Sequence, residues 1–216
     1  LVRSRGLGDV YKRQLSLSSG IPEERMRAVN GCKRNIDYAA SMGCGIIIGF
    51  LKGGPGSDRE VSERLFLESM LELKPYIEEK KVQVLIEATN HKEASIIRTL
   101  KEGAHVINFL DCPFIQLLAD TYHMNIEEPS LVDSLSEYMN YYPHLHISDD
   151  NRAYPGLGSL DFTAIYRKLM ECGYKGTVAV EGNIQHGLLE DTQICAAYLH
   201  KMCSGLHTPS RVPSHA

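Results

Sequence analysis

Short apolar runs alternate with amphipathic segments through most of this 216-residue chain. Apolar positions recur at the helical period over 22–40, 58–79, 92–102, 131–140, 161–172 and 189–203. Runs that are apolar throughout predict buried strands at 45–50, 82–87, 115–119, 143–148 and 177–181. Strands that are apolar on both faces and separated by helices are typical of a parallel sheet covered by helices, so the sequence predicts an α/β fold.

Four of the predicted strands end in a side chain that can bind a metal: Glu87, Asp120, His146 and Glu181. Successive members of this set are 33, 26 and 35 residues apart, and each interval is about one strand plus one helix. In a closed (β/α)8 barrel the carboxyl ends of all strands surround one mouth, so residues placed there converge on a common point. The sequence therefore predicts a fold of the (β/α)8 TIM-barrel type with one polar site at its mouth.

The predicted barrel is incomplete, with about five of eight βα units, counting the run at 45–50 and the four ligand-bearing strands. The run LSLSSG at 15–20 is predicted to be the remnant of a preceding strand, and the missing units would precede it. We expect residues 15–203 to form this partial barrel domain. The polar tail 204–216, which contains Pro and Ser, is expected to be unstructured. The leader 1–14 resembles translated sequencing-adaptor sequence and is expected to be non-native.

Three carboxylates and one imidazole form an oxygen-rich ligand set that suits a divalent metal, with Mn²⁺ or Co²⁺ favoured and Mg²⁺ also compatible. Each acid taken alone could instead cap the following helix or pair with a lysine. Their recurrence at successive strand ends favours the metal. Loops that leave a barrel mouth also place polar groups around a bound substrate, and here those loops carry Asn90, Glu93, His123 and Arg152.

Charge and hydropathy argue against several other classes of protein. The net charge of −4, with no local basic patch, gives no attraction to nucleic acid. The longest apolar run, 43–51, is too short to cross a bilayer, so no membrane association is expected. The six cysteines are widely spaced and form no C-x-x-C pair, as expected of reduced thiols in a cytoplasmic protein.

Four segments carry a resemblance to a known family: EATNHKE (87–93), DTYHMNIEE (120–128), HISDDNRAYPGLG (146–158) and VAVEGN (178–183). They resemble the ketose 3-epimerases of the D-tagatose and D-psicose group, within the xylose isomerase-like sugar phosphate isomerase/epimerase barrels, over residues 20–203. The resemblance implies that the metal is held by Glu87, Asp120, His146 and Glu181. It also implies that the substrate is bound by Glu93, His123 and Arg152.

Epimerisation at carbon 3 explains why two glutamates are needed. A proton leaves one face of the sugar and another arrives on the opposite face, so two bases flank the carbon. The resemblance gives these catalytic roles to Glu87 and Glu181, with the divalent metal as the Lewis acid that stabilises the enediolate. The expected protein is a metal-dependent isomerase that acts on a small ketose. The resemblance further implies a homodimer or homotetramer for a full-length member.

Other functions share this barrel and stay open. Hydroxypyruvate isomerases, inosose dehydratases and C-glycoside-cleaving subunits use a similar metal set on other substrates. An apurinic endonuclease-like zinc hydrolase would need further ligands, including Asp-x-His after the His146 strand, where this chain reads DDNRAYPGLG. An inactive barrel fragment or non-catalytic subunit is the remaining alternative, because the missing units would build part of the sugar pocket.

Overall fold

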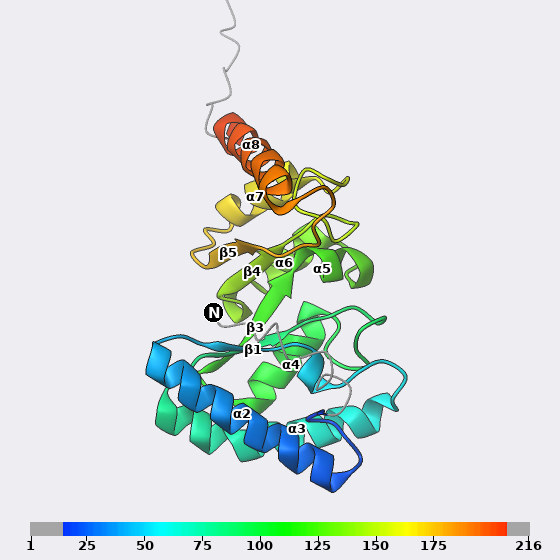
Figure 1. Cartoon of the computed structure of the whole chain (residues 1–216), viewed down its shortest axis with the longest axis vertical. Coiled ribbons are helices and arrows are strands. Elements are labelled where there is room, and N and C mark those ends of the chain that lie inside the picture. Colours follow the sequence, from blue (N-terminus) through cyan, green and yellow to red (C-terminus); the bar gives the residue numbers. More distant parts are fainter. Residues whose placement is uncertain (1–14, 207–216) are drawn as a thin grey trace, which may run out of the picture.

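The computed structural model describes residues 15–206 of the chain. Within them, five strands form one parallel sheet in the order β1-β2-β3-β4-β5, and helical segments follow each strand (Figure 1). The elements are α2 (Pro22–Met42), β1 (Ile46–Ile48), η1 (Phe50–Lys52), α3 (Arg59–Lys80), β2 (Val84–Glu87), α4 (Leu100–Leu110), β3 (Ile115–Asp120), α5 (Thr121–Glu127), α6 (Leu131–Glu137), η2 (Met139–Tyr141), β4 (His144–Ile147), α7 (Phe162–Glu171), β5 (Thr177–Val180) and α8 (Leu188–Leu206). The predicted α/β fold, an incomplete barrel with five βα units, is confirmed.

Alternating side chains give the sheet two different faces. Val84 and Ile86 of β2 belong to the main hydrophobic core, which they share with residues of α2, α3 and α4. Successive side chains of a strand point to opposite faces, so Glu87 lies on the other face from Ile86. The same alternation in β3 separates the core residue Ala119 from Asp120. The helix-covered face is therefore apolar, and polar side chains collect on the opposite face at the ends of the strands.

Residues 15–20 do not form the predicted strand remnant. The backbone N–H of Leu17 donates to Leu51 O over 2.8 Å, and Ser69 Oγ donates to Leu17 O over 2.7 Å. The Leu17 side chain is fully buried in the core. The segment is therefore tied to η1 and α3 by one anchored residue, and it pairs with no strand of the described sheet.

The helix predicted over 92–102 is wrong, because α4 begins only at Leu100. Thr99 caps this helix: its side chain accepts the backbone N–H of Glu102 over 3.2 Å. The buried residues Ile96 and Ile97, which contributed to the helical pattern, lie in a loop before the cap. A helical spacing of apolar residues indicates that their side chains are buried. A buried loop with the same spacing also buries these side chains, so the pattern alone does not show that the segment is a helix.

Helix α5 is an element that the periodic pattern did not predict. Asp120 Oδ1 accepts the N–H of Tyr122 over 2.9 Å and that of His123 over 3.4 Å, so the last residue of β3 caps the helix that follows directly. The helix predicted at 131–140 is divided into α6 and η2. Helix α8 continues past the predicted end at 203 to Leu206. The predicted leader and the rest of the predicted tail lie outside the described residues.

Membrane-spanning helices and disulfide bonds are absent from the described residues. In the part of the chain that the structure describes, no helix combines the length and the apolar character needed to span a bilayer. None of the six cysteines, all of which lie within the described residues, forms a disulfide.

Candidate active site

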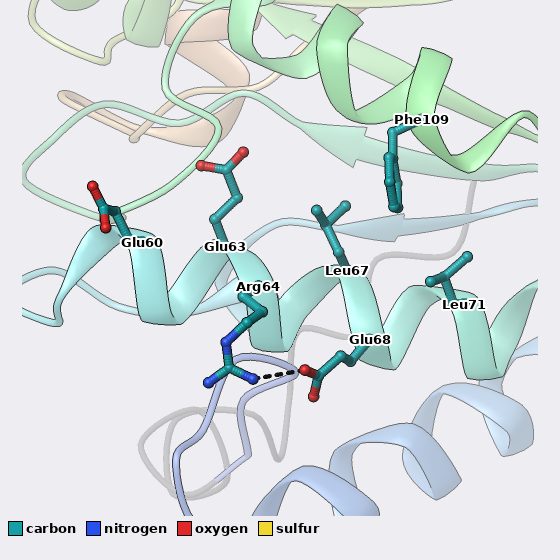
Figure 2. A pocket seen from close by; sticks show the side chains of 7 residues that line it. All are labelled: Glu60, Glu63, Arg64, Leu67, Glu68, Leu71 and Phe109. Carbon is teal, nitrogen blue, oxygen red and sulfur yellow. Dashed lines mark hydrogen bonds and ion pairs between the residues drawn. The ribbon is translucent and has the colours of Figure 1, made fainter.

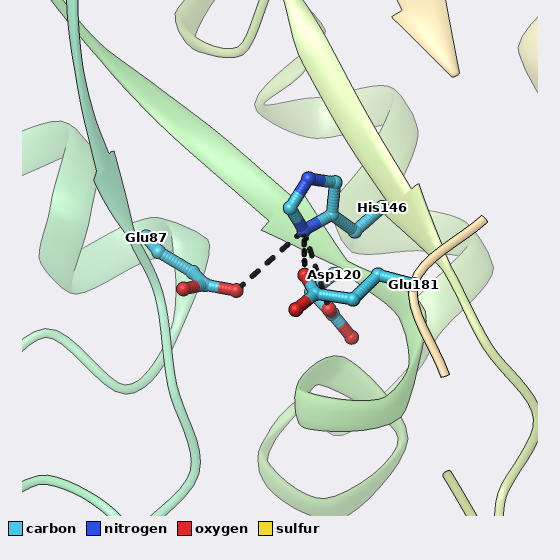
Figure 3. A group of neighbouring side chains, drawn as sticks. All are labelled: Glu87, Asp120, His146 and Glu181. Carbon is cyan, nitrogen blue, oxygen red and sulfur yellow. Dashed lines mark ion pairs between the residues drawn. The ribbon is translucent and has the colours of Figure 1, made fainter. Parts of the chain in front are cut away.

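Four polar side chains meet at the carboxyl ends of four neighbouring strands (Figure 3): Glu87 of β2, Asp120 of β3, His146 of β4 and Glu181 just after β5. One ligand atom of each lies within 4.8 Å of the ligand atoms of the other three. Glu87, Asp120 and His146 are buried, and the side chain of Glu181 keeps 9% of its surface exposed. The structure thus brings together the residues that the strand-end pattern singled out, and we refer to them as the four-residue cluster.

The imidazole of His146 faces all three carboxylates of this cluster. Its Nδ1 atom lies 3.8 Å from Glu87 Oε1 and 3.8 Å from Asp120 Oδ2, and it contacts Glu181 Oε2. In Figure 3 Glu87 and Glu181 approach the ring from different sides. The Nδ1 atom is buried, and no hydrogen bond within the described residues satisfies it. Such a nitrogen, surrounded by carboxylate oxygens, fits a divalent cation, so the cluster can hold a metal.

Arg152 lies against the cluster through its guanidinium group. Its Nη1 atom donates to both carboxylate oxygens of Asp120, over 2.7 and 2.6 Å, and to Ser148 Oγ over 2.9 Å. Its Nη2 atom is 3.7 Å from Glu181 Oε2. The guanidinium carbon lies 5.1 Å from the centre of the Tyr122 ring, which is within cation–π range. Arg152 therefore offsets part of the negative charge of two cluster residues.

The loop that carries Arg152 is held in shape by one buried carboxylate. Asp149 accepts backbone N–H groups from residues further along the loop, Gly156, Gly158 and Leu160, over 3.0, 3.0 and 2.8 Å. Arg152 itself has a φ of 64°, in the left-handed region that residues with a side chain rarely adopt. A strained backbone of this kind costs about 1–3 kcal/mol and persists where its surroundings enforce it. The Asp149 contacts provide this enforcement and so direct the guanidinium toward the cluster.

His123 reaches the cluster from the first turn of α5, and a neighbouring residue fixes its ring. Its Nδ1 atom accepts from the side chain of Asn90 over 2.8 Å and from the Asn90 backbone N–H over 3.3 Å. Nδ1 is thus an acceptor, which assigns the proton of the neutral ring to Nε2. That Nε2 atom lies 4.0 Å from Glu87 Oε1. Burial lowers the pKa of His123, while the charges of Asp120 and Glu87 oppose this shift.

Glu93 lies in the turn after β2 and is half-buried. Its backbone N–H donates to Asn90 O over 2.9 Å, which fixes the turn. Its negative charge acts on two basic side chains near the cluster: it counts among the influences that raise the pKa of Lys52 and of His123 against burial. Of the predicted substrate-binding residues, His123 and Arg152 therefore lie beside the four-residue cluster, and Glu93 acts through its charge on His123 and Lys52.

The fold of this chain is that of a known protein family. The family model described as xylose isomerase-like TIM barrel matches residues 5–197. The chain belongs to the xylose isomerase-like TIM barrel family. The match begins at residue 5, which lies inside the predicted leader 1–14. The boundary of that leader therefore stays a prediction.

Similar proteins within the xylose isomerase-like barrels are sugar epimerases. The chain is 37% identical over 102 residues to the 3-dehydro-D-guloside 4-epimerase of Escherichia coli (strain K12), which covers 47% of this chain and 39% of that protein. It is 32% identical over 121 residues to the D-psicose 3-epimerase of Ruminiclostridium cellulolyticum, covering 56% of this chain and 41% of that protein. The crystal structure of D-psicose 3-epimerase from Clostridium cellulolyticum H10, described with D-tagatose, superimposes with a TM-score of 0.78 at 24% identity, over 89% of this chain and 75% of that one. The alignments with these curated relatives thus span less than half of the relatives' length.

Lys52 is a residue near the cluster that the sequence patterns missed. It ends η1, just after β1, and is fully buried. Its Nζ atom donates to Thr89 Oγ1. Burial lowers the pKa of Lys52 to about 8, and the charges of Glu87 and Glu93 oppose this shift. The strand-end rule that found Glu87 misses Lys52, because β1 ends at Ile48 and Lys52 follows only at the end of η1.

Gly49, also just after β1, is the second residue that the patterns missed. A Cβ atom at this position would lie 2.6 Å from Glu87 Oε2, which is closer than a carbon and an oxygen approach without displacement. The absence of a side chain at Gly49 therefore leaves the space that the Glu87 carboxylate uses. No single-sequence pattern shows this, since it depends on the pairing of β1 with β2.

An open pocket of about 420 Å³ lies elsewhere, between α3 and α4 (Figure 2). Its apolar side chains are Leu67, Leu71 and Phe109, and its rim is charged. None of the candidate site residues described above lines it. We therefore assign the chemistry to the four-residue cluster and not to this pocket.

Proposed function

We propose that this protein is a divalent-metal-dependent sugar epimerase that inverts carbon 3 of a ketose, with Glu87 and Glu181 as its two acid/base groups. The observation that carries the proposal is the convergence of three carboxylates and one imidazole, with ligand atoms within 4.8 Å of one another, at the mouth of a xylose isomerase-like barrel. Two glutamates on different sides of His146 support a two-base reaction.

The names of the relatives support one shared chemistry. A ketose 3-epimerase inverts the carbon next to a carbonyl at carbon 2, and a 4-epimerase of a 3-dehydro sugar inverts the carbon next to a carbonyl at carbon 3. In both reactions the exchanged proton is acidified by the neighbouring carbonyl. Because the E. coli 4-epimerase is 37% identical to the matched part of this chain, a 3-keto sugar inverted at carbon 4 is the second candidate substrate.

The mechanism assigns a separate task to each glutamate. One carboxylate takes the proton from the carbon beside the carbonyl, and the other carboxylate delivers a proton to the opposite face. Glu87 lies 4.0 Å from His123 Nε2, so that imidazole can hold an oxygen of a sugar placed beside Glu87. Well-placed proton transfer of this kind contributes about 10² to 10⁴ in rate.

The remaining residues bind and orient the sugar. Arg152 and His123 offer N–H donors to the oxygens on which negative charge grows, which is preorganised electrostatic stabilisation. Glu93 accepts a hydrogen bond from a sugar hydroxyl. A divalent cation, Mn²⁺ or Co²⁺ by our proposal, would be held by Glu87, Asp120, His146 and Glu181 and would supply Lewis acidity toward the carbonyl oxygen.

The proposal includes the setting of the enzyme. The absence of disulfides among the six described cysteines supports a reducing, cytoplasmic compartment. We propose that the full-length protein is a homodimer or homotetramer with a small sugar as its partner and without nucleic acid or membrane.

The deciding experiment follows deuterium from solvent into the sugar. The chain, alone and extended at its N-terminus with the corresponding βα units of the E. coli relative, is loaded with Mn²⁺ and incubated in deuterated water with D-psicose, D-fructose and a 3-keto glucoside. We expect deuterium at the inverted carbon beside the carbonyl. Label at carbon 1 of an aldose–ketose pair, loss of water, or nicking of abasic DNA would each move the protein to another function of the barrel.

Glu181→Gln is the variant that tests the two-base step. We expect exchange to fall at least about 100-fold in this variant, because one of the two proton-transfer groups is lost. Metal content is measured in parallel, so that loss of the base is separated from loss of the ion. The matched control is Glu190→Gln on the exposed first turn of α8, which should keep full exchange. Undiminished exchange in Glu181→Gln would remove the two-base mechanism.

A further inference from the structure

Thr121 and Ser148 form a buried hydrogen-bonded pair between two segments that carry cluster residues. Thr121 directly follows Asp120, and Ser148 lies two residues after His146. The hydroxyl of Thr121 donates to Ser148 O over 2.6 Å and accepts the backbone N–H of Ser148 over 2.9 Å. Both residues are fully buried. One side chain thus satisfies both backbone polar groups of Ser148, and we refer to the two residues as the hydroxyl pair.

The hydroxyl pair continues the link between β3 and β4 beyond the end of their backbone ladder. The ladder ends with Asp120 opposite His146. The chain after Asp120 leaves the sheet, because Thr121 is the first residue of α5. The Thr121 side chain takes over the role of a backbone partner for Ser148. Side chains alternate along an extended chain, so the Ser148 hydroxyl lies on the same face as His146.

The Ser148 hydroxyl in turn holds the side chain of Arg152. The Nη1 atom of Arg152 donates to Ser148 Oγ over 2.9 Å and to the two carboxylate oxygens of Asp120 over 2.7 and 2.6 Å. Because Nη1 carries two protons, these three acceptors occupy both of them. Asp120, Thr121, Ser148 and Arg152 are therefore joined in a closed ring, and the N–H groups of Nε and Nη2 remain for other partners.

We propose that Thr121 and Ser148 are positioning residues that fix the guanidinium group of Arg152 for binding the sugar. The side chain of Arg152 is 15% exposed, and an arginine loses much rotamer freedom when it is held in one place. Asp120 attracts its charge, and Ser148 adds a second, differently placed acceptor that sets the direction of Nη1. The inference rests on the proposed function in giving Arg152 a sugar oxygen to hold. The hydroxyl pair acts through Arg152.

The first test measures how fast phenylglyoxal, which modifies accessible guanidinium groups, reacts with Arg152 in the chain without metal or sugar. Peptide mass spectrometry follows the modification, with Arg167 on the exposed surface of α7 as the internal reference. In Ser148→Ala we expect Arg152 to react at least about tenfold faster, because a hydrogen bond from a charged group is lost. Unchanged reactivity of Arg152 in a folded Ser148→Ala protein overturns the proposal.

Variants of Thr121 separate positioning from stability. Thr121→Val keeps the shape of the side chain but removes both of its hydrogen bonds to Ser148, so Arg152 should again react at least about tenfold faster. Thr121→Ser keeps the hydroxyl and should restore the slow reaction. A role in stability alone would lower the midpoint of urea unfolding in Thr121→Val and leave Arg152 slow to react below that transition. If Thr121→Val does not fold, Ser148→Ala decides the matter.

Two matched controls remove hydroxyl groups elsewhere. Ser41 Oγ donates to Tyr38 O over 2.7 Å on α2, and Thr192 Oγ1 donates to Leu188 O over 2.6 Å on α8. Both residues are exposed. Ser41→Ala and Thr192→Val should leave the reactivity of Arg152 unchanged. Faster modification of Arg152 in these controls would show that the effect is not specific to the hydroxyl pair and would contradict the proposal.

The second test uses the chain extended at its N-terminus and loaded with Mn²⁺, as in the deuterium experiment. Ser148→Ala should lower kcat for exchange about tenfold and change KM less, because Arg152 is proposed to bind oxygens on which negative charge grows in the transition state. An unchanged kcat in an active Ser148→Ala protein would overturn the inference. If no sugar is exchanged by the wild type but Arg152 still reacts faster in Ser148→Ala, the proposed reaction is rejected and the positioning of Arg152 stands.

Discussion

Glu87 reaches the centre of the site because Gly49, on the neighbouring chain segment, has no side chain. A Cβ atom there would lie 2.6 Å from Glu87 Oε2, whereas a Cβ atom at Gly54, a few residues later, would have no neighbour within 4 Å. At the scale of single residues, the geometry of a carboxylate thus depends on what a different strand leaves empty.

Gly49→Ala should therefore impair the site while the fold persists. The added methyl group displaces the Glu87 carboxylate, and a displacement of about 1 Å costs on the order of 100-fold in rate. Deuterium exchange and Mn²⁺ affinity are the measurements, with circular dichroism as the check on folding. The matched control is Gly54→Ala, which should behave as the wild type. Equal activity of the two variants would contradict the role given to Gly49.

Some site residues could be predicted from the sequence and others could not. Glu87, Asp120 and His146 stand out because each is a polar residue at the end of an apolar run, and parallel strands bring such ends together. Lys52 follows its strand through an intervening 3-10 turn, so the rule misses it. Gly49 matters only through its distance from another strand, which no local pattern contains.

At the scale of elements, α4 shows how capping decides where a helix starts. The apolar pattern begins before the cap, yet the helix begins after Thr99, whose hydroxyl accepts the N–H of Glu102. The side chain of Glu102 in turn accepts the backbone N–H of Arg98 at its Oε2 atom, over 2.8 Å. The backbone N–H groups of Arg98 and Glu102, on either side of Thr99, are therefore both hydrogen-bonded, as in a capping box. The loop before it is thereby left free to carry Glu93 to the site. Because α4 begins only at Leu100, the residues before Thr99 form this loop and not a helix.

Thr99→Ala should lower the free energy of unfolding by about 1 kcal/mol, because the first turn of α4 loses the hydrogen-bond acceptor of its cap. Urea denaturation followed by circular dichroism measures this change. Thr99→Ser keeps the hydroxyl and should retain most of the stability. If the alanine and serine variants are equally stable, the cap does not hold this boundary.

At the scale of the whole molecule, the described sheet has two edges, β1 and β5. All residues of β2 and β4 are buried, but β5 is largely exposed, with Val178 at 38% and Val180 at 41%. Exposed apolar edge strands favour pairing between molecules. The chain belongs to a family of TIM barrels, and closure of a barrel removes such edges.

The chain alone should therefore self-associate through β5. Replacing both Val178 and Val180 by Lys should reduce that association, because charges on an edge strand oppose pairing. Light scattering coupled to size-exclusion chromatography, at equal protein concentrations, measures the mass. Leu71→Lys, an apolar residue exposed to 46% on α3, is the control and should not change the mass. A monomeric wild-type chain, or equal masses for all three proteins, would show that β5 is not the contact surface.

The alternation of apolar runs and amphipathic segments was enough to determine the parallel α/β fold, since burial on both faces of a strand leaves a local and regular pattern. It also determined which acids and which imidazole stand at strand ends. The tertiary structure alone decided the start of α4, the strained loop that directs Arg152, and the approach of Lys52 and Gly49 to Glu87. These features depend on distances between segments far apart in the chain, and such distances exist only once the sheet has formed.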